Sequence, residues 1–406
     1  MVHFVQESDG ARVRRFRRRA GFTQAELGAR VGRTQGWVSM LENDEIVLDS
    51  ISLINTIARE LRVHPNELTG RPYRHGRTPA EDRGHASIGE IRRQIQRYDL
   101  VPDWNGAVRN VEELKGAVKE LTELRQKASY IALGEKAPAV LAELQAATAM
   151  YAGRDKEACF GLLAVAYRET DAFIYGLGYE DLSVLATRCM RWAAARSGDP
   201  YLVTVGNYLR VRELWSTASW DDALTVIDDA ITSVQGPCDA GDRPALAIWG
   251  GLQLRASITA ARKLDADEAY ARLHLAHEAV DRLGNDDRND YYKLVFTRPN
   301  VAIHDVAVAV ELGDGVEAIK RSTTLRIPAD MPASRSGHHY LDLSRGWLFY
   351  GNRDRALAAM EKAERIAPAL VRNHPMAQKT VRTLLDAEVR GYRERVRRLG
   401  ARMNVL

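Results

Sequence analysis

One stretch near the N-terminus, TQAELGARVGRTQGWVSMLEN at residues 23–43, constrains the fold of this chain most strongly. Thr23 followed by Glu26 is the pattern of a capping box, in which a hydroxyl and a carboxylate accept hydrogen bonds from the free amides at a helix start. Gly32 permits a left-handed turn, and Thr34 offers a second cap before apolar residues recur at helical spacing. The stretch therefore predicts a helix, a tight turn and a second helix.

The surrounding residues 11–70 extend this pattern to five short helices. We expect Val13, Phe16 and Ala20 to face a core from the first helix, and Pro65 to begin the last. The fourth helix adds an apolar face made of Leu53, Ile54, Ile57 and Leu61. This spacing predicts a small helical bundle around the helix–turn–helix.

These features together resemble the XRE family of DNA-binding domains, the type found in lambda repressor and Cro. The resemblance covers an arginine-rich first helix and the segments TQAELGARVG, SMLEN and HPNELTG. It implies that residues 1–70 form a DNA-binding domain whose second motif helix enters the major groove of double-stranded DNA. A bundle that serves only as a protein-interaction module remains the alternative.

Residue chemistry then suggests which side chains of this domain meet DNA. The amide of Gln35 both donates and accepts, as adenine recognition requires, while Gly36 allows close approach. Hydroxyl, amide and guanidinium groups at the helix starts and in the segment ARVRRFRRRAG suit phosphates, although an arginine run is also typical of a solvated helix face. Trp37 fits either a core position or a backbone contact, and we favour packing. The candidate DNA-binding residues are Arg14, Arg18, Gln24, Arg33, Thr34, Gln35, Gly36, Trp37, Ser39 and Met40.

Residues 71–90 are rich in Pro, Gly and Arg and lack apolar periodicity, which predicts a linker. From there on, IGEIRRQIQRYDLVPDW and VEELKGAVKELTELRQKA indicate two amphipathic helices that either connect the domains or pair with a second subunit. Helical patterns continue to the C-terminus, and strand alternation never persists. We therefore expect an all-α chain whose second domain spans residues 91–406.

A repeating pattern runs through this second domain. HHYLDLSRGWLFYGNRDRALAAMEKAERIAP has large apolar residues on one helix, a GN turn and small residues on the next helix, and so resembles a tetratricopeptide repeat. YLRVRELWSTASWDDALTVIDDAIT and LQLRASITAARKLDADEAYARLHLAHEAV repeat it less sharply. Small residues recur because stacked antiparallel helices must approach closely. The pattern predicts a tetratricopeptide-like helical solenoid.

Such a solenoid has a concave surface formed by the first helix of each pair. Polar residues at the inward positions of these helices suit a peptide backbone or a carboxylate, because amide and guanidinium donors match those acceptors. Solvated faces and intramolecular ion pairs remain alternatives for each of them, and residues 298–300 could form a polar notch at a helix start. The candidate ligand-binding residues are Tyr208, Arg212, Arg255, Asn300, His304, His338, Asp342 and Arg345.

Enzyme motifs are absent from the sequence: it has no phosphate-binding glycine loop, HExxH or Gly-x-Ser-x-Gly. His274 and His277 lack a third ligand at a recognisable spacing, and the three cysteines show no paired spacing. We therefore expect no enzymatic activity, no cofactor and no metal. With no long apolar run and no signal peptide, we expect a cytoplasmic protein that does not contact the membrane.

The joint architecture resembles the actinobacterial XRE regulators and, more distantly, the peptide-responsive RRNPP quorum-sensing regulators. This resemblance implies a transcription factor whose repeat domain binds a peptide or small-molecule effector. We expect it to be a homodimer on an inverted-repeat operator, because one such bundle covers only a half-site. A helical-repeat adaptor that regulates DNA binding through a protein partner is the main alternative. An antitoxin-like or phage-type repressor is a third.

Overall fold

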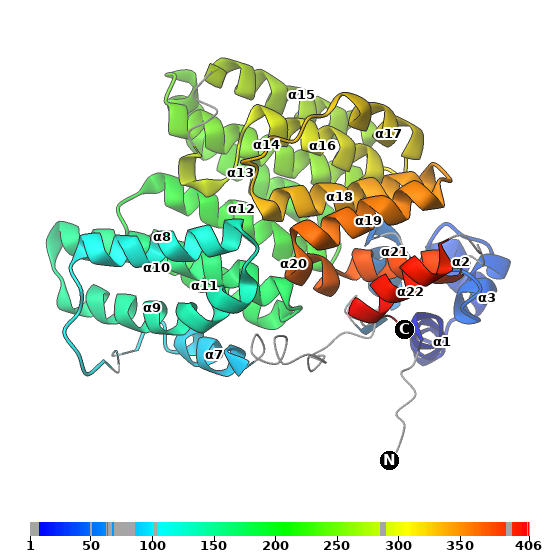
Figure 1. The fold of residues 1–406 in the computed structure, drawn as a ribbon, viewed down its shortest axis with the longest axis horizontal. Helices are drawn as coiled ribbons and strands as arrows, with labels where there is room; N and C mark the ends of the chain where they lie inside the picture. The colour runs from blue at the N-terminus through cyan, green and yellow to red at the C-terminus, as the bar shows by residue number, and fades with distance from the viewer. Residues whose placement is uncertain are drawn as a thin grey trace, which may run out of the picture.

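The computed structural model describes residues 8–48, 51–61, 63, 67–68, 86–100, 102, 104–284, 290–386, 392–403 and 405. Throughout these residues the chain forms helices and connecting turns, with no strand. Figure 1 shows a small N-terminal group of helices beside a larger array of stacked helices. The all-α prediction is therefore confirmed.

The N-terminal domain contains the helices α1 (Asp9–Arg19), α2 (Gln24–Arg30), α3 (Gln35–Glu42) and α4 (Ile51–Leu61). Its core includes the apolar residues expected from helical spacing, among them Val13, Phe16, Leu27, Val38, Leu41, Ile54, Ile57 and Leu61. The expected core position of Ala20 is wrong: this residue is exposed because it follows α1 as its C-cap. Pro65, where a fifth helix was expected to begin, lies outside the described residues.

Of the predicted linker at 71–90, residues 71–85 lie outside the described residues. Helix α7 (Ile88–Gln96) starts in the last part of that range, in the segment IGEIRRQIQRYDLVPDW for which an amphipathic helix was predicted. Ile88 and Ile91 are buried, and α7 packs on α9 (Tyr130–Met150) and α11 (Glu180–Ala194) of the same chain. The helical array therefore begins at α7.

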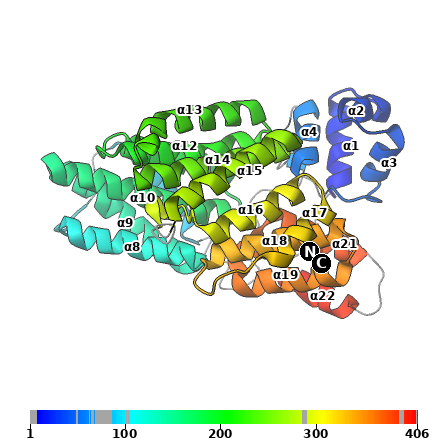
Figure 2. The ribbon, with the colours of Figure 1, turned by 90° about the horizontal axis from the view of Figure 1, so that it is seen from above.

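Consecutive helices of the array pack against one another as hairpins, as Figures 1 and 2 show. A final group follows, made of α20 (Pro368–Asn373), α21 (Pro375–Asp386) and α22 (Arg393–Arg402). The helices between α7 and this group, apart from α9 and α11, are α8 (Val111–Gln126), α10 (Gly153–Gly176), α12 (Pro200–Ser216), α13 (Trp220–Asp239), α14 (Arg243–Lys263), α15 (Ala266–Leu283), α16 (Arg298–Glu311), α17 (Gly315–Thr324), α18 (Ala333–Phe349) and α19 (Arg353–Ile366).

Small residues lie at the helix interfaces, where the repeat pattern placed them. The second helices of three pairs bury a series of alanines with no exposed surface: Ala223, Ala230, Ala269, Ala276, Ala356 and Ala363. Their short side chains let neighbouring helices approach closely. This packing of consecutive helices resembles a repeat array, while the specific likeness to tetratricopeptide repeats stays a prediction.

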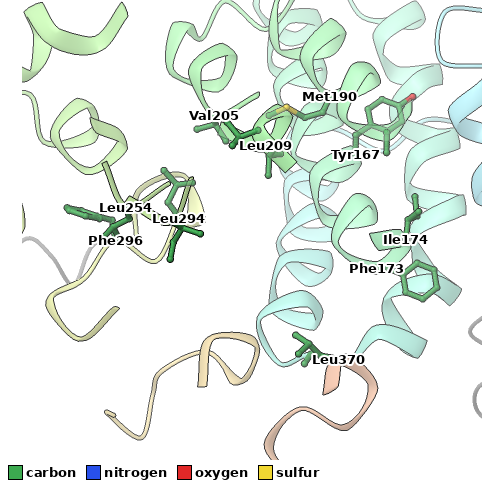
Figure 3. Close-up of a cluster of buried hydrophobic side chains, with 14 of the residues drawn as sticks. Tyr167, Phe173, Ile174, Met190, Val205, Leu209, Leu254, Leu294, Phe296 and Leu370 are labelled. Carbon is green, nitrogen blue, oxygen red and sulfur yellow. The ribbon is translucent and has the colours of Figure 1, made fainter. Parts of the chain in front are cut away.

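Early and late helices of the array also meet, because α18 packs against α8 and α20 packs against α10. One apolar core runs through the array from Ile88 to Met403, and Figure 3 shows part of it. The segment 290–296, which includes the short 3-10 helix η2 (Tyr291–Lys293), crosses between α15 and α16 and buries Leu294 and Phe296 in that core. This segment is therefore part of the packed interior of the array.

The N-terminal domain docks on one end of the array, as Figure 2 shows. The buried Asn55 of α4 donates from Nδ2 to the carbonyl oxygen of Trp215, at 3.1 Å. The buried Lys379 of α21 lies 3.0 Å from a carboxylate oxygen of Asp9 and donates to the carbonyl of Leu48. These contacts hold α1 and α4 against the array.

Candidate functional site

The helix–turn–helix forms as its capping residues predict. Thr23 Oγ1 accepts from the amide of Glu26 at 3.1 Å, and the Glu26 carboxylate accepts from the amide of Thr23 at 2.6 Å. Gly32 takes the left-handed conformation with φ +66°, and Thr34 Oγ1 accepts from the amide of Trp37 at 3.2 Å. Local chemistry therefore determines where α2 ends and α3 begins.

Glu42 holds three helices together, a role that sequence reasoning missed. Its buried carboxylate accepts from Arg17 Nε at 2.5 Å and Nη2 at 2.9 Å, and from Gln24 Nε2 at 3.0 Å. Burial alone would raise the pKa of Glu42, but the hydrogen bonds from Arg17 and Gln24 lower this pKa below its usual value. The available signal was a carboxylate one turn after Val38, on the apolar face of α3.

Arg14 and Gln24, two of the candidate DNA contacts, have partners inside the domain. Arg14 Nη2 donates to the carbonyl of Glu42 at 2.9 Å and to Oδ1 of Asn43 at 2.5 Å. Gln24 donates to the Glu42 carboxylate, as described above. If these two residues contact DNA phosphates, they do so in place of, or in addition to, their hydrogen bonds to Glu42 and Asn43 at the end of α3.

The remaining candidates share an outward face of the domain. Thr34, Gln35, Gly36 and Met40 are exposed, and Ser39 is half-buried. Figure 2 shows α3 at the outer edge of the molecule, on the side of the domain away from the array. The groups expected to read bases are therefore accessible, and their contacts with DNA stay a prediction.

Around this face lie the other candidate residues. Trp37 is half-buried and packs against the domain core, the alternative that we favoured. The guanidinium of the exposed Arg33 lies over the Trp37 ring, 5.7 Å from its centroid. Arg18 is exposed on α1.

In the array, the candidate ligand residues lie on α12, α14, α16 and α18, the first helices of their pairs. The Arg255 guanidinium lies over the ring of Tyr208, 3.9 Å from its centroid. The pKa of His304 is lowered to about 3, first by burial and then by the charges of Arg335 and Arg255. The pKa of His338 is lowered to about 4 by burial and by Arg335, Arg212 and Arg262. The structure thus brings residues from four separate pairs together.

We call this region the inner arginine surface, made of Arg168, Tyr208, Arg212, Arg255, His304, Arg335 and His338. Sequence reasoning missed two of its members. Arg168 lies on α10, which is also the first helix of its pair, and Arg335 lies in the first turn of α18. Position on a first helix is the signal that could have found both.

Like charge accumulates on this surface. Burial and neighbouring arginines lower the pKa of Arg212 to about 9 and that of Arg168 to about 10. Burial alone would raise the pKa of Tyr208, but Arg255 and Arg335 outweigh it and lower this pKa to about 8. Within this surface His338 is exposed to solvent, Arg168 is buried and the other members are half-buried.

Two other candidates, Arg345 and Asp342, are engaged in internal contacts. Arg345 Nη1 lies 3.2 Å from the Glu311 carboxylate and 3.3 Å from that of Asp342, and Arg262 Nη2 lies 3.4 Å from Glu311. Burial raises the pKa of Asp342 to about 6 even though Arg345 opposes this effect. Arg345 and Asp342 therefore form an intramolecular ion pair, one of the two alternatives to ligand binding given for these residues.

The polar notch expected at residues 298–300 is not formed. Asn300 is 2% exposed, and its carbonyl accepts from Nδ1 of His304 at 2.8 Å. Arg298 is paired instead with Asp281, and both side chains are more than half exposed. These two residues point to different surroundings because only one of them faces the packed side of α16.

The described histidines and cysteines do not form a metal centre. His277 Nε2 lies 2.9 Å from Asp305, and no described group of three or more His, Cys, Asp or Glu could hold a metal ion. Cys159, Cys189 and Cys238 are free and buried. None of the described helices has both the length and the apolar character needed to cross a membrane.

Comparison with known proteins gives one finding. The family model described as a helix-turn-helix domain matches residues 10–69. No curated protein and no solved structure matches the chain. The match supports an XRE-type helix–turn–helix domain and hence a DNA-binding regulator, while the likeness to actinobacterial or RRNPP regulators stays a prediction.

Proposed function

We propose that this protein is a transcriptional regulator in which the helical array senses a peptide or small-molecule signal and sets the DNA affinity of the docked N-terminal domain. DNA binding is assigned to the exposed face of α3, and sensing to the inner arginine surface. The observation that carries the proposal is a residue that contacts both parts, Trp215 at the end of α12.

The Trp215 side chain belongs to the sensing region. Arg255 and Arg262 lie over its ring, at 4.8 and 4.2 Å from the centroid, and its Nε1 donates to Thr259 at 2.9 Å. Its carbonyl oxygen accepts the hydrogen bond from Asn55 of the DNA-binding domain. A ligand that moves Arg255 therefore acts on a residue that touches α4.

The hydrogen bonds that dock the DNA-binding domain have energies of the size needed for allosteric control. One neutral hydrogen bond contributes about 0.5–1.5 kcal/mol, and one to a charged group about 1.5–3 kcal/mol. A useful allosteric coupling is typically about 1–3 kcal/mol, so a change at Asn55 and Lys379 is large enough. The ligand needs different affinities for the docked and released arrangements, since equal affinities would shift nothing.

We further propose that the regulator acts as a homodimer on an inverted repeat. One helix–turn–helix domain covers only a half-site, and two-fold proteins read half-sites about one helical turn, roughly 34 Å, apart. The array is expected to supply the subunit contacts. Light scattering of the full chain at micromolar concentration should give a dimer, and a monomer bound to a single half-site would contradict this part.

The regulatory proposal is tested on an operator selected from random or genomic DNA with the purified full-length protein. Gel shifts then compare the wild type with Asn55→Ala and Lys379→Met, and the exposed Asn105→Ala serves as a matched control. We expect the two docking variants to change operator affinity or the response to a cell extract by about fivefold or more. The control should behave as wild type.

The proposal fails if both docking variants keep wild-type affinity and wild-type response. Fractionating the active extract separates the two candidate functions. Activity in the low-molecular-weight fraction supports sensing, whereas activity confined to a protein fraction supports the adaptor function.

A further inference from the structure

We propose that the inner arginine surface binds a small oxyanionic ligand, a molecule carrying carboxylate or phosphate groups. This inference rests on the proposed sensing function and deepens it by naming the chemical class of the signal. Three observations support it: the charge balance of the surface, the geometry of its hydrogen-bond donors, and the hydrogen bonds that two of its arginines already make to the chain's own backbone.

The charge balance comes first. Arg212 pairs with Asp171, Arg125 pairs with Glu169, and Glu311 is shared by Arg262 and Arg345. After these pairs, three guanidinium groups, those of Arg168, Arg255 and Arg335, have no carboxylate within 4.0 Å among the described residues. These three guanidinium groups therefore have no direct carboxylate partner among the described residues, although Glu169 and Asp290 act on Arg168 from further away.

The lowered arginine pKa values show that burial and mutual repulsion disfavour the charged guanidinium groups on this surface. The charged form of Arg212 is disfavoured first by burial and then by Arg255. The Nε–H groups of Arg212 and Arg255 are buried without an acceptor. An oxyanion at this surface would supply a counter-charge to the guanidinium groups, whose planar forks match carboxylate and phosphate oxygens.

Tyr208 lies in the field of these same arginines. It is faced by Arg255 from α14, Arg335 from α18 and Arg168 from α10. These charges favour its ionised form, so the phenol itself becomes a counter-ion as the pH rises through about 8. A bound oxyanion would compete with that ionisation and return the Tyr208 pKa toward its ordinary value of about 10.

The internal segment 290–296 distinguishes a small anion from a peptide backbone. Arg168 donates to the carbonyls of Tyr292 and Lys293, the latter at 2.7 Å, and Arg335 donates to the carbonyl of Leu294 at 3.3 Å. These donors would otherwise bind the carbonyls of a peptide ligand. Because these donors already bind the chain's own backbone carbonyls, the surface attracts a ligand mainly through its positive charge.

Calorimetry on the full-length protein at about pH 7 and low chloride tests this proposal with two probes, citrate and inorganic pyrophosphate. Each probe is titrated into the wild type, Arg255→Gln, and Arg154→Gln on the exposed side of α10. Arg255 is the informative position, because removing it leaves no described carboxylate without its partner. We expect Arg255→Gln to weaken binding about tenfold or more, the loss of one charge-assisted contact, and Arg154→Gln to match the wild type.

The near-ultraviolet absorbance of tyrosinate gives a second readout. In the wild type, the bound probe should raise the pKa of Tyr208, and the affinity for the probe should fall above about pH 8. Tyr208→Phe identifies the signal by removing it. Preferred binding of citrate assigns a carboxylate ligand, and preferred binding of pyrophosphate assigns a phosphate ligand.

Two outcomes overturn the inference: neither probe binds, or Arg255→Gln binds both probes as well as the wild type does. Operator gel shifts separate this failure from that of the proposed function. If extract still regulates DNA binding but no oxyanion binds, only the ligand class is wrong. If an oxyanion binds through Arg255 without changing operator affinity, the ligand class stands and the proposed regulation fails.

Discussion

Replacing Glu42 by Ala should unfold or greatly loosen the DNA-binding domain. Its carboxylate receives Arg17 from α1 and Gln24 from α2, while α3 carries the carboxylate itself. The substitution removes all three bonds at once. It also leaves the Arg17 guanidinium, 9% exposed, without its anion.

The expected magnitude follows from that burial. Removing one partner of a buried ion pair typically costs about 3–5 kcal/mol, because the remaining charge stays desolvated. Small domains are stable by about 5–15 kcal/mol in total, so this loss is a large fraction of the whole. Replacing both partners with apolar residues, as in Arg17→Met with Glu42→Met, should recover most of the loss.

Hydrogen exchange measured by mass spectrometry on the full-length protein tests this expectation. Peptides from residues 8–48 should lose protection in Glu42→Ala and largely regain it in the double variant. Because the pKa of Glu42 is lowered in the folded protein, its stabilisation is present above the ordinary value of 4.5 and is lost as the pH falls through the folded value. A loss of less than about 1 kcal/mol in Glu42→Ala would refute the reasoning.

Three further predictions follow from single contacts. Gly10→Ala should destabilise the domain by about 1–3 kcal/mol in thermal unfolding, since its Cβ would lie 2.1 Å from the Leu41 carbonyl oxygen; unchanged unfolding would contradict that geometry. Asp342→Asn should stabilise the protein by up to about 3 kcal/mol at about pH 7.5 and little at pH 4. The reason is that the pKa of Asp342 is raised from 3.8 to about 6 in the folded protein, so the stability of the wild type falls as the pH rises between these two values. Denaturant titrations at both pH values check this, and equal effects would count against it. Arg255→Gln should raise the pKa of Tyr208 in a spectrophotometric titration, and a value still near 8 would show that Arg255 does not set it.

Sequence reasoning predicted most of the architecture because the relevant signals are local. A capping box depends on residues three apart, and Gly32 adopts its left-handed turn without help from distant parts of the chain. The buried alanines of α13, α15 and α19 follow a spacing that one helix pair already imposes. Such signals also located the outward face of α3.

The same reasoning could not separate first-helix residues without a carboxylate partner from internally paired ones. Arg255 and Arg345 both occupy first helices, yet Arg255 faces two aromatic rings while Arg345 lies 3.2 Å from a carboxylate oxygen of Glu311. Nothing within either helix distinguishes them, because the deciding partners come from other helix pairs. The internal role of Glu42 was missed for the same reason.

By itself, then, the sequence determined the helices, their order and the helix–turn–helix, because capping and 3.6-residue periodicity act within a few turns of chain. Only the tertiary structure decided which polar groups meet. It joined Arg168, Tyr208, Arg255 and Arg335 from three first helices and the start of a fourth, and it set Asn55 against Trp215 across the domain boundary. Those contacts depend on the position and orientation of each helix in the array. Both result from the sum of many small packing angles between helices, which no short segment of sequence specifies.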